Sequence, residues 1–189
     1  MIDLPESDLR ERLATALSVP RWIDEIVAAA PFSDVDALIV AAETAADPLT
    51  DSEIDAAMAH HPRIGEQPVG PGAAAEFSRR EQASAADADD LLVARALAEG
   101  NATYEDRFDR VFLIRAAGRS RAEIVEELER RLKLDDETER RIVGEQLREI
   151  AVLRLRSMFG EAEGARAVED AIKADESHSS ARSDGASGR

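Results

Sequence analysis

Histidine is the side chain best suited to proton transfer near neutral pH, and this chain contains three, His60, His61 and His178. His61 precedes Pro62 at the start of a stretch, residues 60–72, in which prolines and glycines are too dense for a regular element. Loops held by a rigid scaffold often carry catalytic groups, so His61 is a candidate general acid–base. A histidine before a proline is more often a surface or capping residue, and the pattern alone leaves both interpretations open. Two adjacent histidines point in different directions at a helix end, which does not favour a zinc site.

A second candidate lies in the sequence SRREQ at residues 78–82. Ser78 and Glu81 are three residues apart on a predicted helix and therefore share a face. One interpretation is an exposed charged turn, in which Glu81 pairs with a neighbouring arginine. The other is a pair of polar side chains that faces a ligand. The spacing does not choose between the two.

The last predicted helix contains a cation on its apolar side. At about 100° per residue, one arc of that helix collects apolar side chains, and Arg154 falls near the centre of the arc. The apolar members are Val143, Leu147, Ile150 and Met158. A guanidinium is rarely buried without an anionic partner, because removing it from water costs several kcal/mol. The alternatives are a structural ion pair, a bend that turns Arg154 to solvent, and a substrate anion.

Helix start signals recur along the chain and predict an all-α fold. Three hydroxyl residues are each followed three positions later by an acidic residue, as in a reciprocal N-terminal cap. The pairs are Ser33 with Asp36, Thr50 with Glu53, and Ser120 with Glu123. Pro20 suits the first turn of another helix, whose apolar stripe consists of Trp22, Ile23, Ile26 and Val27.

The remaining elements follow from breaks in this pattern. Helices are expected over about 73–84 and 87–99, followed by a break at Gly100 and Asn101 and a short helix over 103–108. VFLI at 111–114 is apolar and suits an extended chain, and a last helix is expected from about Asp136 to at least Phe159. Residues 1–173 then form one helical domain. Residues 174–189 are small and polar, which predicts a disordered tail.

Composition limits the partners of the chain. A length of 189 residues suits a single domain with a substantial core, and the absence of cysteine excludes disulfides and thiolate chemistry. A formal net charge of −16 argues against nucleic acid and anionic membranes as partners, and favours a small ligand. The sequence contains no apolar run of about 20 residues and begins without a basic region leading into an apolar one, which predicts a soluble cytoplasmic protein.

Several motifs together resemble a known family. They are HPRIGE at 61–66, SRREQ at 78–82 and NATYEDRFDRVFLIRAAGRS at 101–120. The likeness extends from about Trp22, through Pro31 and Phe32, to EIAVLRL at 149–155. In this order the motifs closely resemble the 2-oxo-4-hydroxy-4-carboxy-5-ureidoimidazoline (OHCU) decarboxylase family, in its bacterial form.

The resemblance implies a compact multi-helix bundle that forms a homodimer, needs no metal or organic cofactor, and converts OHCU to (S)-allantoin in urate breakdown. His61 matches the catalytic histidine of the family, and Glu81 a carboxylate that orients the substrate. The other positions that match substrate-binding residues are Pro62, Ser78, Gln82, the main chain of Leu113, Ile114, Arg115, Ala116 and Ala117, and Arg154.

The chain also departs from the family pattern. Many relatives read FGFPF where this chain reads FDRVF at 108–112, so the turn into the 113–117 segment is a place where a difference is expected. The loop after HPRIGE is shorter and richer in glycine and proline than in some relatives. Two other functions are considered: a non-catalytic acidic helical interaction module, and a hydrolase with a histidine-bound metal. The first predicts His61, Glu81 and Arg154 to be scattered, whereas a decarboxylase needs them around one concave site.

Overall fold

The computed structural model of the chain describes residues 1–2, 4–59, 61, 63–64 and 91–183, and the surroundings of side chains up to residue 160. Its helices are α1 (Glu6–Ala16), α2 (Pro20–Ala28), α3 (Val35–Ala45), α4 (Asp51–Met58), α6 (Leu91–Phe108), α7 (Arg121–Arg131) and α8 (Asp136–Ser183). Within these residues the β-structure is a single isolated bridge between Ile2 and Phe32. The predicted all-α class is confirmed.

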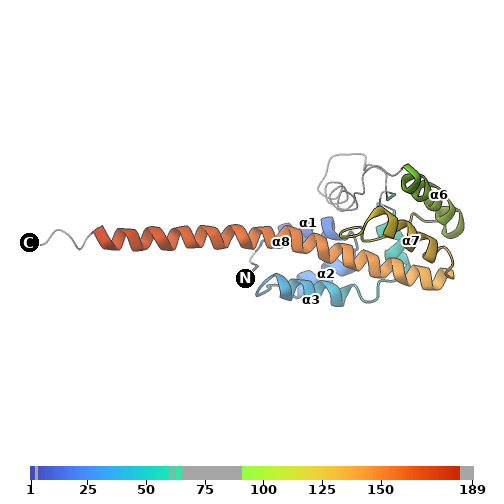
Figure 1. The fold of residues 1–189 in the computed structure, drawn as a ribbon. Coiled ribbons are helices and arrows are strands. Elements are labelled where there is room, and N and C mark those ends of the chain that lie inside the picture. Colours follow the sequence, from blue (N-terminus) through green and yellow to red (C-terminus); the bar gives the residue numbers. More distant parts are fainter. Residues whose placement is uncertain (3, 60, 62, 65–90, 184–189) are drawn as a thin grey trace, which may run out of the picture.

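Helix α8 is the longest of the described helices and runs across the whole molecule (Figure 1). Its first half packs on α1, α3 and α4, whereas α6 packs on α7. Its C-terminal part extends beyond the other labelled helices, and it continues to Ser183 through residues for which the composition predicts disorder. A helix that is already formed adds one hydrogen bond for each further residue, so it can continue without a core contact. Residues 184–189 lie outside the described part of the chain.

Two apolar clusters form the core. The first joins α1–α4 to α8 and includes Trp22, whose indole N–H donates to the carbonyl of Ala42 at 2.9 Å. The second lies between α6 and α7 and includes Tyr104 and Phe112, whose rings meet edge to face at 5.2 Å. The segment between α6 and α7 contributes side chains to both clusters.

The helix starts agree with the sequence at three of four places. Reciprocal caps are present at Thr50 with Glu53 and at Ser120 with Glu123, and α2 begins at Pro20. The fourth prediction is wrong by one residue, because the carboxylate of Asp34 accepts from the N–H of Ala37 at 2.8 Å and caps α3. The hydroxyl of Ser33 donates to that same carboxylate instead. The anion is the stronger acceptor for the N–H groups at a helix start.

The predicted break at Gly100 and Asn101 is also wrong, since α6 runs through both residues. A Cβ atom built on Gly100 would lie 2.5 Å from Cδ2 of Leu128 in α7, so the glycine permits a close approach of the two helices. The Asn101 side chain donates to the carbonyl of Ile64 at 3.0 Å. Both residues therefore serve tertiary contacts. The helix expected over 73–84 and most of the loop over 60–72 lie outside the described residues. Of the helix expected over 87–99, residues 91–99 are described and form the first half of α6.

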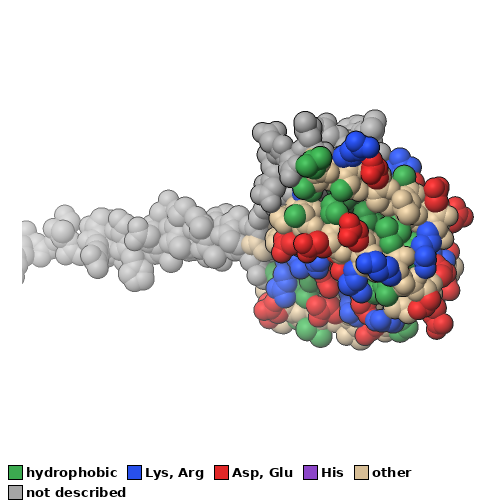
Figure 2. All heavy atoms as spheres, turned by 45° about the vertical axis from the view of Figure 1, so that its right-hand side comes forward, with side chains coloured by type: hydrophobic (Ala, Val, Ile, Leu, Met, Phe, Trp, Pro, Cys, Tyr) green, Lys and Arg blue, Asp and Glu red, His purple; other side chains and the backbone are tan. Residues whose placement is uncertain are grey.

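Acidic and basic side chains are interspersed over the face of the molecule shown in Figure 2. Many arginines pair with carboxylates, such as Arg140 with Asp55 and Arg156 with Asp36. Exposed pairs of this kind stabilise a protein only weakly, so the fold depends mainly on the two apolar clusters. None of the described helices has the length and apolar character needed to span a membrane.

Candidate functional site

The segment that connects α6 and α7 passes between the two core clusters. Phe112, Ile114 and Ala116 belong to the second cluster, whereas Leu113 belongs to the first and Val111 packs against the first. This alternation with a period of two is that of an extended chain, as the apolar VFLI sequence suggested. Side chains packed on both sides thereby hold the main chain from Val111 to Ile114, and Ala116 anchors it further along.

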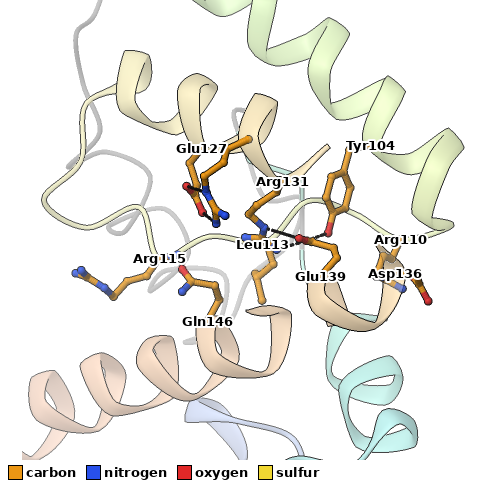
Figure 3. Close-up of polar contacts among 10 residues, drawn as sticks. Tyr104, Arg110, Leu113, Arg115, Glu127, Arg131, Asp136, Glu139 and Gln146 are labelled. Carbon is orange, nitrogen blue, oxygen red and sulfur yellow. Dashed lines mark hydrogen bonds and ion pairs between the residues drawn. The ribbon is translucent and has the colours of Figure 1, made fainter. Parts of the chain in front are cut away.

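Polar contacts hold the main chain of this segment along one edge (Figure 3). The carbonyl of Leu113 accepts from Nη1 of Arg131 at 2.7 Å, and the N–H of Arg115 donates to Oε1 of Gln146 at 2.9 Å. In an extended chain, the N–H and C=O of one residue point to the same edge, and those of the next residue point to the opposite edge. The edge that carries Leu113 and Arg115 therefore faces α7 and α8, and the peptide groups of Ile114 face the opposite edge.

The turn that follows is closed by its own contacts. The carbonyl of Ala116 accepts from the N–H of Arg119 at 3.0 Å, and Gly118 has a positive φ of 80°. The carbonyl of Ala117 accepts from the Arg115 side chain at 2.9 Å, and Nε of Arg115 also pairs with Glu149 at 2.9 Å. The Arg115 side chain is thus engaged at the end of the segment by groups of the protein.

Behind the segment lies a fully buried cluster of polar side chains from three helices. Arg131 of α7 and Glu139 of α8 form an ion pair with no solvent exposure, in which Nε lies 2.9 and 3.0 Å from the two carboxylate oxygens. The Tyr104 hydroxyl of α6 donates to Glu139. Burial, and then the hydrogen bond to Glu139, raise the pKa of Tyr104, so the hydroxyl keeps the proton that it donates.

The guanidinium of Arg131 also lies over the ring of Phe112, 4.7 Å from its centroid. Phe112 immediately precedes Leu113, whose carbonyl the same guanidinium binds. Arg131 therefore contacts both the side chain and the main chain at the beginning of the segment. Arg131, its partners Glu139 and Tyr104, and Gln146, which binds the N–H of Arg115, were not among the residues singled out from the sequence.

His61 lies just after α4 and is partly buried, and its N–H donates to the carbonyl of Met58 at 3.0 Å. Arg63 and Ile64 are held by α6, since Arg63 forms a two-pronged pair with Glu105 and the carbonyl of Ile64 accepts from Asn101. The Ile64 side chain joins the second core cluster, to which Ile114 and Ala116 belong. The packing therefore brings the His61 region to the same core cluster as the 113–117 segment.

Arg154 is buried, with 5% of its surface exposed, as its place on the apolar arc predicted. Its Nη1 donates to the carbonyl of Ala16 at 3.2 Å, at the C-terminal end of α1 where the helix dipole is negative, and it takes part in further interactions. Gln146 and Arg154 lie eight residues apart on one face of α8, roughly 12 Å along the axis at 1.5 Å per residue. A carboxylate partner for Arg154 stays a prediction.

The other candidates, Pro62, Ser78, Glu81 and Gln82, lie outside the described residues. His61 is thus three residues from Ile64, which packs in the same cluster as Ile114 and Ala116. Arg154 lies on the same face of α8 as Gln146, which binds the N–H of Arg115. In the part of the chain that is described, three or more His, Asp or Glu side chains do not gather as a metal site would need.

The departure from the family pattern at FDRVF has a structural explanation. Asp109 occupies the position of the glycine in FGFPF and has a positive φ of 53°, the left-handed region that glycine favours. Its N–H donates to the carbonyl of Glu105 at 2.8 Å and ends α6. Aspartate is one of the few other residues that tolerate this conformation. The left-handed turn into the site segment is therefore present without the glycine.

Comparisons with known proteins agree with this architecture. In the uric acid degradation bifunctional protein TTL of Arabidopsis thaliana, 108 residues are 32% identical, covering 56% of this chain and 33% of the relative. The chain thus spans about a third of that protein's length. A crystal structure of an OHCU decarboxylase in the presence of (S)-allantoin matches with a TM-score of 0.66 at 22% identity, over 80% of this chain and 98% of the other.

A crystal structure of (S)-allantoin synthase matches with a TM-score of 0.59 at 14% identity, over 82% of this chain and 50% of the other. At such identities the two structures establish the fold. The family model for OHCU decarboxylase matches residues 3–156, a range that contains the whole second core cluster and all buried members of the first except Ile2 and Phe159. The chain belongs to the OHCU decarboxylase family.

Proposed function

We propose that this protein is a cofactor-independent carboxy-lyase that converts OHCU to (S)-allantoin in urate degradation. The observation that carries the proposal is the family match over residues 3–156, because it spans His61, Glu81, the 113–117 segment and Arg154 in one continuous match. The relative from Arabidopsis thaliana, whose name places it in uric acid degradation, supports the same pathway.

The substrate's own chemistry explains why few side chains suffice. Its carboxylate sits on a hydroxyl-bearing ring carbon next to a ring C=N bond, which accepts the electron pair released when the bond to CO2 breaks. The ring nitrogen that receives this electron pair takes up a proton from solvent, and the product of the step is an enol. Collapse to allantoin then needs removal of the hydroxyl proton and delivery of a proton to the neighbouring carbon from one face.

His61 is the residue to which we assign both proton transfers. A neutral imidazole takes the hydroxyl proton, and the resulting imidazolium returns a proton to carbon, a cycle suited to a group with an ordinary pKa of about 6.5. Ionised Glu81 accepts hydrogen bonds from the ring and ureido N–H groups, so that the substrate presents one face to His61. Protonation from one face gives one enantiomer.

The remaining contacts are assigned to binding. Main-chain N–H groups of the 113–117 segment that point away from α7 and α8, such as that of Ile114, donate to substrate carbonyls, since the N–H of Arg115 is already bonded to Gln146. Pro62, Ser78 and Gln82 complete the wall on the side of His61 and Glu81. Arg154 anchors a carbonyl or the carboxylate; tight binding of a leaving carboxylate would stabilise the ground state and slow the reaction.

A homodimer in the cytoplasm is part of the same proposal. Light scattering coupled to size-exclusion chromatography tests the assembly, because a dimer gives about twice the mass of the 20.5 kDa chain. A monomer at micromolar concentration would contradict that part and leave the reaction itself to be tested separately.

The reaction is tested by generating OHCU in place from urate with the two preceding enzymic activities and following allantoin by circular dichroism. We expect this protein to accelerate the appearance of one enantiomer. A rate and a racemic product equal to those of the uncatalysed control would refute the proposed function.

The role of His61 is tested by comparing His61→Asn with His60→Asn. Asparagine keeps hydrogen-bonding ability but cannot cycle a proton, so His61→Asn should fold and lose at least about 100-fold in turnover. The neighbouring substitution is the matched control and should change turnover little. Equal losses in the two variants would show that His61 is not the proton shuttle.

A further inference from the structure

We propose that Arg131, Glu139 and Tyr104 are positioning residues, which set the main chain of residues 113–117 at the geometry needed to bind substrate. The inference rests on the proposed function, since it assigns these residues a purpose in that reaction. The inference is based on the hydrogen bond that Arg131 of this buried cluster donates to the carbonyl of Leu113, at the beginning of the segment (Figure 3).

Stability alone does not account for such a cluster. A buried ion pair loses the hydration of both partners, and well-packed apolar side chains of similar volume often stabilise a protein as well or better. Apolar side chains cannot donate a hydrogen bond to a main-chain carbonyl. Arg131 does so at 2.7 Å from a position with no solvent exposure.

The contacts fix the direction of that hydrogen bond. The guanidinium is planar, and its Nε and Nη2 atoms are occupied by the Glu139 carboxylate, which leaves Nη1 directed at Leu113. Tyr104 holds Glu139 from a third helix. The cluster therefore ties α6, α7 and α8 to a single carbonyl oxygen.

Gln146 holds the same edge one peptide further along, through the N–H of Arg115. With both ends of this stretch fixed, the peptide groups of Ile114 between them have a defined direction on the opposite edge. That is the edge which the proposed function assigns to the substrate carbonyls. The cluster thus acts on substrate through the main chain and without touching it.

The kinetic consequence differs from that of a catalytic residue. Main-chain donors that hold ring and ureido carbonyls act alike on substrate and transition state, so loosening them raises KM and leaves kcat nearly unchanged. A purely structural role predicts the reverse, since unfolded protein lowers the apparent kcat while KM stays the same. We expect a rise in KM of at least about fivefold, with kcat of the folded fraction within about twofold.

The test uses the full chain with the triple substitution Tyr104→Phe, Arg131→Met and Glu139→Leu. Replacing the cluster as a unit leaves no unpaired buried charge, which is the change that most often prevents folding. Arg131→Lys is the conservative second variant: it keeps the charge beside Glu139 but lacks the fork that reaches both Glu139 and Leu113. It should fold and raise KM by a smaller factor.

The chain offers a matched control in Arg21 and Glu53. Arg21 also forms a two-pronged pair with a glutamate, at 2.7 and 3.0 Å, and also donates to a main-chain carbonyl, that of Ala45 at 3.0 Å. This pair joins α2 to α4, and within the described residues its hydrogen bonds go to other parts of the chain than residues 113–117. The variant Arg21→Met with Glu53→Gln should keep the wild-type KM.

The outcomes separate the two proposals. A raised KM in the triple and lysine variants, with an unchanged KM in the control, supports positioning; a folded triple variant with wild-type KM overturns it. If the wild-type protein does not accelerate decarboxylation, the proposed function fails. In that case amide hydrogen exchange tests whether the cluster fixes the main chain of residues 113–117. This claim is overturned if the amides of these residues exchange no faster in either cluster variant than in the wild type.

Discussion

Gly100 is the residue at which a single added methyl group should most clearly test the packing of α6 on α7. A Cβ atom at this position would lie 2.5 Å from Cδ2 and 3.2 Å from Cγ of Leu128. Carbon atoms in contact prefer about 3.5 to 4.0 Å. Leu128 is 1% exposed, so its methyl group has little room to move away. A rotation about the Cβ–Cγ bond of Leu128 would move Cδ2 but would leave the close approach to Cγ unchanged.

Two effects of opposite sign decide the stability of Gly100→Ala. Alanine in a helix interior is favoured over glycine by about 1 kcal/mol. Overpacking of a filled core costs roughly 1–3 kcal/mol. Because the overlap with Leu128 is about 1 Å and involves a buried branch point, we expect overpacking to win, with a net loss of about 1 kcal/mol.

The assay is equilibrium unfolding in urea, applied to Gly100→Ala, Leu128→Ala and the double variant. Leu128→Ala alone should cost about 2–5 kcal/mol. In that background the overlap is gone, so Gly100→Ala should stabilise the protein by up to about 1 kcal/mol. Gly160→Ala is the control, because a Cβ at Gly160 meets nothing within 4 Å, and it should not lower stability. A Gly100→Ala variant more stable than wild type, or an equal effect in both backgrounds, would refute the packing explanation.

Three further predictions concern other parts of the chain. Asp109→Val should lose at least about 1 kcal/mol in thermal unfolding because of the left-handed backbone, whereas Asp109→Gly should not; equal losses would contradict the strain. The hydrogen bond from Arg21 lowers the pKa of Glu53 to about 2, so its contribution is complete above the ordinary pKa near 4.5 and is lost as pH falls toward 2. The stability gap between wild type and Glu53→Gln, about 1 kcal/mol after screening at the exposed Arg21, should close over that range in urea titrations and stay constant above it. Truncation after Ala174 should leave the melting temperature and activity unchanged, and a clear drop would show that the end of α8 docks.

The local signals in the sequence predicted local structure well. Hydroxyl and carboxylate three residues apart at Thr50 and Ser120 gave the correct starts of α4 and α7, because a reciprocal cap is satisfied within one turn. Gly100 was misjudged for the opposite reason. Its significance lies in a contact with Leu128, 28 positions further along the chain, which no local preference contains.

The buried cluster left a signal of the kind that revealed Arg154. Arg131 follows Ile124 and Leu128 at helical spacing on the buried face of α7, and Glu139 precedes Val143 by one turn on the arc that contains Arg154. Each is a charge on an apolar face and therefore a candidate for burial. That the two pair with each other depends on how α7 turns into α8, which their spacing alone does not determine.

An extended main chain inside a helical protein raises a problem that helices do not have. A helix satisfies its own peptide groups, whereas a chain buried without a partner strand must find donors and acceptors among side chains. Along one edge of residues 113–117 these are Arg131 and Gln146, which occupy the positions that a neighbouring strand would take. A neighbouring β-strand could pair with this edge equally well, but the fold would then have to contain a β-sheet. Side chains from two helices achieve the same pairing within the bundle, and the opposite edge is then fixed in direction by the first. In the proposed reaction the substrate carries its own electron sink and His61 moves the protons, so the main task left to the rest of the site is to hold the substrate. A main chain with a fixed direction serves that task, and the proposal thereby gives the costly buried ion pair behind residues 113–117 a purpose.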